Sequence, residues 1–77
     1  MGFQEIKDQH DEALMPTYGR FQVALESGCG AVAVDVDGRG YVDFGSGIGV
    51  NALGYCEPGW VAAVQEQAAK LQHISNL

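Results

Sequence analysis

Among the side chains whose types could support acid–base or nucleophilic chemistry, three aspartates and two serines are the first candidates. Asp35, Asp37 and Asp43 lie close together in the stretch "AVAVDVDGRGYVDF". Aspartates at turns and strand ends most often form the turn and stay solvated, so we expect that role for them. Ser46 and Ser75 have no histidine or lysine at a spacing that would activate a nucleophile. The residues alone therefore predict no catalytic group in these 77 residues.

The cysteines and histidines do not form a metal-binding pattern. Cys29 and Cys56 lie outside any CxxC motif, and His10 and His73 are far apart in the chain. A structural zinc site needs four such ligands at short spacings, so we expect no metal site. We interpret the two cysteines as ordinary thiols rather than as a disulfide.

The composition is that of a globular protein with an acidic balance. Hydrophobic residues make up 47% of the chain and the formal net charge is −6, with only four lysines and arginines. So few cations disfavour nucleic-acid binding, because nothing would neutralise the phosphates. No apolar run approaches the ~20 residues of a membrane span. The acidic start "MGFQEIKDQHDEALM" is unlike a signal peptide, so the cytoplasm is the predicted location.

The stretch "SGIGVNALGY", residues 46–55, combines three glycines with good core side chains. Each glycine costs backbone entropy that a plain helix or strand would avoid. Either the backbone turns sharply here, or something must approach it closely. The stretch is not a dinucleotide-binding motif, because it lacks the GxGxxG spacing.

The elements around this stretch can be predicted from residue patterns. Residues 3–15 predict a helix that Pro16 ends. Residues 21–28 alternate as in a strand, with Phe21, Val23 and Leu25 on one face. Asp37-Gly38, between two β-rich runs, predicts a tight hairpin turn with positive φ at both residues.

The hairpin completes a small antiparallel meander of three strands. Val32, Val34 and Val36 are expected on one face of it, with Tyr41 and Phe44 reaching across. The fold class is therefore α+β: an N-terminal helix, a three-stranded antiparallel meander, a glycine loop and an amphipathic helix.

The second helix is predicted to begin at Pro58, which suits the first helical position. It carries an apolar stripe of Trp60, Val64, Ala68 and Leu71, and His73 is expected near its C-terminus. The sheet edges have no obvious cover, and the chain stops at "SNL" without a cap. We therefore expect residues 1–77 to be a piece of a larger protein.

Four motifs carry a specific resemblance that extends from about Leu14 to Leu77: "YGRF", "VALESG", "DFGSGIGVNALG" and "LQHISNL". In this order and spacing they resemble the start of the class III, fold-type I aminotransferases, and within that class most closely the acetylornithine aminotransferases. Departures from the family pattern are modest. Gln22, Cys29 and Val34 replace a usual proline, lysine and tryptophan, and Tyr55 and Glu57 stand where two histidines are common.

The resemblance implies an N-terminal segment from the small domain of such an enzyme, without its catalytic domain. It implies that the glycine stretch passes the substrate pocket at a dimer interface, with Tyr18, Ile48 and Gly49 as substrate-binding residues. The alternatives that Ile48 is a core residue and Tyr18 a turn aromatic stay open. Pyridoxal phosphate is the implied cofactor, and the family places its lysine, aspartate and phosphate loop downstream of this stretch.

The implied reaction moves the δ-amino group of N-acetylornithine to 2-oxoglutarate, in arginine biosynthesis, within a homodimer. An aliphatic residue at Ile48 favours an acylated substrate, while the segment alone is expected to be inactive. Two alternatives remain. One is another class III ω-aminotransferase, acting on ornithine, succinylornithine or 4-aminobutyrate. The other is a free-standing interaction module without catalysis.

Overall fold

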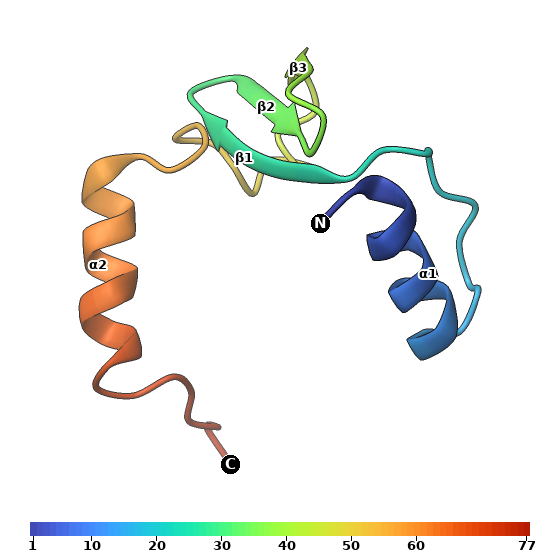
Figure 1. Cartoon of the computed structure of the whole chain (residues 1–77). Helices are drawn as coiled ribbons and strands as arrows, with labels where there is room; N and C mark the ends of the chain where they lie inside the picture. The colour runs from blue at the N-terminus through green and yellow to red at the C-terminus, as the bar shows by residue number, and fades with distance from the viewer.

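A computed structural model describes all residues of the chain, from Met1 to Leu77. Its elements follow the order helix, three strands, helix: α1 (Phe3–Ala13), β1 (Leu25–Cys29), β2 (Val32–Asp35), β3 (Gly40–Val42) and α2 (Pro58–Ala68). Figure 1 shows the small sheet between the two helices, which extend away from it on opposite sides. The predicted α+β arrangement is confirmed.

The three strands form one antiparallel sheet in the order β1-β2-β3, as expected for a meander. Strand β1 begins at Leu25 rather than at residue 21, and a register shift follows between Leu25 and Ser27. The expected longer strand was wrong because β2 ends at Asp35, which leaves residues 21–23 without a partner. One further bond, from Val36 N–H to the Ala24 carbonyl at 3.0 Å, extends the pairing slightly.

The hairpin between β2 and β3 forms at the predicted place with a different turn. Only Gly38 has a positive φ, at 85°, so the prediction of positive φ at Asp37 as well was wrong. Gly38 N–H donates to the Asp35 carbonyl at 3.1 Å, and Asp35 N–H donates to the Arg39 carbonyl at 2.9 Å. This is the three-residue loop in which a left-handed glycine follows an ordinary turn.

The buried face of the sheet is not the valine face. Ala33 and Asp35 are the only buried residues of the chain, whereas Val32 is exposed. Tyr41 pairs with Ala33 across β2 and β3, so it lies on the Ala33 face, and the expected contact with the valines was wrong. Phe44 is fully exposed and does not reach across either. Val34 and Val36 are only half-buried, because no helix covers the valine face.

Both helices are shorter than their sequence patterns suggested. Helix α1 ends at Ala13 because Leu14 is already extended, with φ −119° and ψ 143°, ahead of the Met15–Pro16 step. Helix α2 begins at Pro58 as predicted, with the Glu57 carboxylate accepting from Trp60 N–H at 2.8 Å.

Helix α2 ends at Ala68, well before the predicted end. The Gln67 carbonyl accepts from both Lys70 and Leu71, which tightens the last turn. His73 therefore lies in irregular chain beyond the helix, and its predicted place at the C-terminus was wrong.

Neither helix packs against the sheet or against the other helix. The apolar stripe residues Trp60, Val64 and Leu71 are all exposed, as are most large apolar side chains of the chain. No helix here combines the length and the apolar character needed to cross a membrane. The chain therefore buries almost no core of its own.

Candidate functional site

The backbone of residues 44–54, here called the glycine turn, adopts an unusual conformation. Ser46, Gly47, Ile48 and Gly49 all have positive φ, at 52°, 58°, 62° and 89°. Left-handed backbone costs roughly 1–2 kcal/mol for each residue that carries a side chain, and it is rarest for β-branched residues such as isoleucine. Ser46 and Ile48 therefore make this run a strained segment, and strain of this kind is concentrated at functional sites.

Asp43 contacts both ends of the glycine turn. Its Oδ1 accepts from the N–H groups of Gly45 and Ser46, at 2.7 and 2.8 Å. Its Oδ2 accepts from the Tyr55 hydroxyl at 2.6 Å. These bonds, with that from Tyr55 the strongest cause, lower the pKa of Asp43, and the same bond raises the pKa of Tyr55. Asp43 is therefore an ionised anchor rather than a solvated turn residue.

Tyr55 is fixed against the turn between β1 and β2. Its N–H donates to the Gly30 carbonyl at 2.8 Å, and its carbonyl accepts from Gly30 N–H at 3.3 Å. A side chain on Gly28 would place Cβ only 2.7 Å from the Tyr55 ring, and one on Gly54 would lie 3.2 Å from Gly30. The glycines thus allow two backbone segments to meet, so both readings of the glycine stretch hold: a sharp turn and a close approach.

In the β2–β3 hairpin, Asp35 accepts hydrogen bonds from the same kinds of donor: two backbone N–H groups and a tyrosine hydroxyl. Asp35 Oδ1 accepts from Asp37 and Arg39 N–H, both at 2.9 Å, and Oδ2 accepts from the Tyr41 hydroxyl at 2.8 Å. Only 5% of Asp35 is exposed, so the expectation of a solvated turn aspartate was wrong for it. The three aspartates do not converge on one centre, and no group of three or more metal-ligating side chains is present.

The residues expected to bind substrate lie on two separate parts of the structure. The Ile48 side chain is 100% exposed on the glycine turn, so it is not a core residue of this chain. Tyr18 is 75% exposed in the segment between α1 and β1, with the Arg20 guanidinium 5.4 Å from its ring centre. Tyr18 lines one of the two main cavities, and Ile48 and Gly49 line neither of them.

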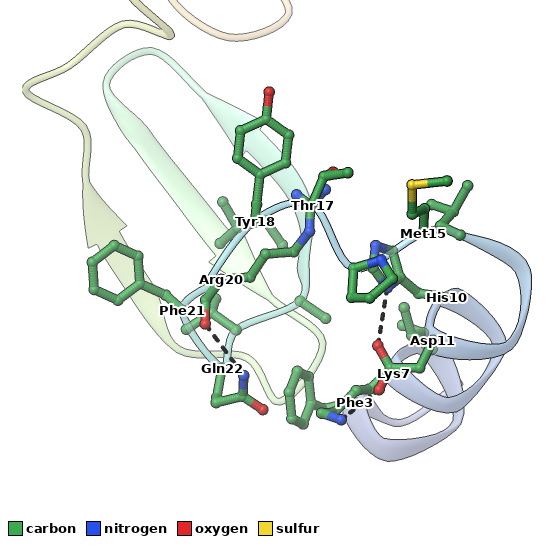
Figure 2. Close-up of a pocket in the computed structure, with 16 residues that line it drawn as sticks. Phe3, Lys7, His10, Asp11, Met15, Thr17, Tyr18, Arg20, Phe21 and Gln22 are labelled. Atoms are coloured by element: carbon green, nitrogen blue, oxygen red, sulfur yellow. Dashed lines mark hydrogen bonds and ion pairs between the residues drawn. The ribbon is translucent and has the colours of Figure 1, made fainter.

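Tyr18 and Arg20 line a groove of about 490 Å³ between α1 and residues 14–25. Figure 2 shows Lys7, His10 and Asp11 of α1 on one side of the groove and the Tyr18–Gln22 segment on the other. Lys7 Nζ lies 2.6 Å from Asp11 Oδ2, and His10 Nδ1 lies 3.1 Å from Asp11 Oδ1. The hydrogen bond to Asp11 raises the pKa of Lys7. Residue patterns alone did not indicate this groove.

The Asp43–Tyr55 contact was not predicted from the sequence. The one signal for it is the departure from the family pattern at Tyr55, and this departure does not indicate a partner. The two residues are 12 positions apart, with the glycine turn between them. Nothing in the sequence between them indicates that the two side chains meet.

Comparison with known proteins places these features in a family. The aminotransferase class-III family matches residues 14–77, which include the Tyr18 segment, the sheet, the glycine turn and α2. This chain belongs to the class-III aminotransferase family. The acetylornithine aminotransferase of Clostridium acetobutylicum is 52% identical to it over 63 residues, covering 82% of this chain and 16% of the relative.

Solved structures of class-III aminotransferases share the fold of the chain. The acetylornithine aminotransferase of Elizabethkingia anophelis superposes with a TM-score of 0.85 at 29% identity, covering 99% of this chain and 20% of that one. The ornithine δ-aminotransferase of Plasmodium falciparum gives 0.84 at 28% identity, covering 99% and 19%. The curated relatives matched most strongly are thus far longer, since this chain spans 16% to 20% of their length.

Proposed function

We propose that residues 1–77 are the N-terminal segment of an acetylornithine aminotransferase. Such an enzyme transfers the δ-amino group of N-acetylornithine to 2-oxoglutarate and forms N-acetylglutamate semialdehyde and glutamate, a step of arginine biosynthesis. The observation that carries this proposal is the 41–52% identity to acetylornithine aminotransferases along most or all of the chain. We place the protein in the cytoplasm as a homodimer, in line with the expectation from the sequence.

Within that enzyme, Tyr18, Ile48 and Gly49 are the proposed substrate-binding residues of the segment. The conformation of the glycine turn supports this role, because its strained backbone presents a fully exposed aliphatic side chain at Ile48. Such a side chain suits the acyl end of an acylated amino acid. The Tyr18 hydroxyl donates no hydrogen bond within the chain, and the adjacent Arg20 forms no ion pair, so both are free to bind substrate carboxylate.

Pyridoxal phosphate, when bound, supplies the electron sink of a transamination. The lysines of this segment do not have the properties of a lysine that binds pyridoxal phosphate covalently. A lysine that bonds to the cofactor must be available unprotonated, whereas Lys7 is paired with Asp11 and its pKa is raised. Lys70, just beyond the end of α2, forms an exposed ion pair with Glu66, with Nζ 3.1 Å from Oε1. We propose that the cofactor-binding residues lie in the rest of the polypeptide and that the segment alone is inactive.

Ornithine aminotransferase is the main alternative, because the Plasmodium falciparum structure superposes on this chain almost as well. Kinetics of the full-length protein distinguish the two. We expect kcat/KM with 2-oxoglutarate to be highest for N-acetylornithine and lower for ornithine, succinylornithine and 4-aminobutyrate. A preference for unacylated ornithine would contradict the proposal and support the alternative.

The segment itself provides the second test. When the 77-residue chain is mixed with pyridoxal phosphate, we expect no absorbance band of a cofactor–lysine adduct. We also expect that reduction with borohydride leaves Lys7 and Lys70 unlabelled. Such a band would contradict the proposed inactivity. If the coding sequence lacks an aminotransferase domain altogether, the third reading, a free-standing interaction module, replaces the enzyme.

A further inference from the structure

The two tyrosine–aspartate pairs of this chain share one chemistry and fix different loops. In each pair the aspartate accepts two backbone N–H groups at Oδ1 and a tyrosine hydroxyl at Oδ2. The Asp35–Tyr41 pair spans 6 positions and lies within the β2–β3 hairpin. The Asp43–Tyr55 pair spans 12 positions and encloses the whole glycine turn.

The backbone between Asp43 and Tyr55 has few other contacts that could fix its shape. Three backbone hydrogen bonds within it close local turns, including Asn51 N–H to the Ser46 carbonyl at 2.9 Å. The side chains of Ile48, Val50 and Leu53 are exposed. Because left-handed backbone is unfavourable at Ser46 and Ile48, a turn with free ends would relax out of this conformation.

Both residues of the Asp43–Tyr55 pair are themselves attached to the sheet. Asp43 directly follows β3, and its N–H donates to the Ala31 carbonyl at 2.7 Å. Tyr55 is attached through its two backbone bonds to Gly30 and through the contact of its ring with Gly28. The hydroxyl–carboxylate bond therefore runs between two fixed points, and it orients the carboxylate whose Oδ1 accepts from the N–H groups of Gly45 and Ser46 at the start of the glycine turn.

We propose that the Asp43–Tyr55 contact sets the conformation of residues 46–49, which makes Tyr55 a positioning residue for substrate discrimination through Ile48. This inference rests on the proposed function, because discrimination presupposes a transaminase whose substrate contacts Ile48. Tyr55 does not need to touch the substrate itself. Its effect reaches the site through the backbone that it closes.

The test compares Tyr55→Phe with Tyr41→Phe in the full-length holoenzyme. Each substitution keeps the aromatic ring and removes the tyrosine hydroxyl that donates a hydrogen bond to an aspartate. Loss of a hydrogen bond to a charged acceptor corresponds to about 10- to 100-fold in an equilibrium constant. We expect Tyr55→Phe to speed amide hydrogen exchange in residues 45–54 by about that factor, and Tyr41→Phe to do so only in residues 36–39.

The substrate ratio is the readout that a merely structural role would not move. Tyr55→Phe should lower kcat/KM for N-acetylornithine relative to ornithine by about tenfold, as expected when one pocket side chain is displaced. Tyr41→Phe should leave this ratio at the wild-type value. Equal ratios in the two variants, or unchanged exchange of the glycine turn in Tyr55→Phe, would overturn the proposal.

A second variant covers the case in which Tyr55→Phe fails to fold. Asp43→Asn keeps an Oδ1 that can accept from Gly45 and Ser46 and removes the anionic Oδ2 from Tyr55. If the two residues act through one contact, Asp43→Asn alone lowers the ratio by about the same factor, about tenfold. Where Tyr55→Phe folds, the double variant changes the ratio no more than either single variant. Additive changes would overturn the proposal. If the wild-type enzyme transaminates neither substrate, the proposed function fails, and hydrogen exchange alone still decides whether the contact sets the turn.

Discussion

The Tyr41 hydroxyl donates a 2.8 Å hydrogen bond to Oδ2 of Asp35, the only charged side chain that this chain buries. The other oxygen of the carboxylate accepts from the backbone N–H groups of Asp37 and Arg39. The hairpin is thus closed around an anion. Because all three hydrogen bonds of the Asp35 side chain are donated to the carboxylate, this closure depends on its ionised form.

The first prediction is a pH dependence of the hairpin. The bond from Arg39 N–H, and next that from the Tyr41 hydroxyl, lower the pKa of Asp35 below its ordinary value of 3.8. A lowered pKa in the folded state stabilises the fold above pH 3.8, and this stabilisation is lost as the pH falls through the folded pKa. The bond to Asp35 raises the pKa of Tyr41 above 10.0, so its contribution is fully present below pH 10.0 and is lost as the pH rises through the raised pKa of the folded state.

Amide hydrogen exchange of residues 36–39 in the full-length protein measures the pH range over which the hairpin is stable. The rates are corrected for the intrinsic effect of pH on exchange. Protection should be highest between the two limits. Asp35→Asn removes the titrating group, so it should flatten the acid limb. An acid limb that persists unchanged in Asp35→Asn would show that another carboxylate controls the hairpin.

The second prediction concerns the contact between Gly28 and Tyr55. A Cβ on Gly28 would meet the Tyr55 ring at 2.7 Å, so Gly28→Ala should displace the ring. Overpacking of this kind costs about 1–3 kcal/mol of stability. Gly19→Ala is the matched control, because nothing lies within 4 Å of its Cβ position. Thermal unfolding of the full-length variants measures the difference, and equal melting temperatures would contradict the contact.

Residues with strong local preferences were the ones from which the fold could be predicted. Pro16 and Pro58 restrict the backbone wherever they stand, so the end of α1 and the start of α2 followed to within a few residues. The position of the hairpin could be predicted from Asp37-Gly38, because this pair has a strong local preference for a tight turn. Its turn type did not follow, because Asp35 supplies bonds to the loop that alternation cannot indicate.

The buried face and the site depended on contacts between distant residues. Three valines at alternate positions suggested a core face, yet the molecule buries Ala33 and Asp35 because Tyr41 lies on that side. The strained run at residues 46–49 likewise lies between Asp43 and Tyr55, whose side chains bond to each other, and Tyr55 also bonds to Gly30. The glycine spacing could indicate a turn or a close approach and no more than that.

The third prediction is that the isolated 77-residue chain associates or has poor solubility. Only Ala33 and Asp35 are buried, and exposed apolar side chains include Trp60, Val64 and Leu71. A chain of this size has a marginal core even when it packs well, and open sheet edges add sites for pairing. Sedimentation and thermal scans at several concentrations test this. A sharp unfolding transition of a monomer would contradict it and favour an independent module.

The fourth prediction tests Tyr18 in the full-length enzyme. Tyr18→Phe keeps the ring beside Arg20 and removes only the hydroxyl. If that hydroxyl binds substrate, kcat/KM should fall by the equivalent of about 0.5–1.5 kcal/mol, and by more if its partner is charged. Unchanged kinetics would show that Tyr18 is only a turn aromatic.

The last prediction tests Ile48, whose side chain is fully exposed on the strained turn. If Ile48 lines the pocket, Ile48→Tyr fills the space of the acyl group, while its new hydroxyl can bind the free amine of ornithine. Discrimination by one pocket side chain is worth ~1–3 kcal/mol, or roughly 10- to 200-fold in kcat/KM. Activity on N-acetylornithine should therefore fall much more than activity on ornithine.

A packing role for Ile48 in the full-length enzyme gives a different result. Overpacking by the larger ring would lower stability by about 1–3 kcal/mol, and both activities would fall together with the melting temperature. Ile48→Val is the matched control, because it keeps a β-branched side chain at the same positive φ and removes one methylene. A substrate ratio that stays constant across Ile48→Tyr and Ile48→Val would rule out the pocket role, even though the chain remains a class-III aminotransferase segment.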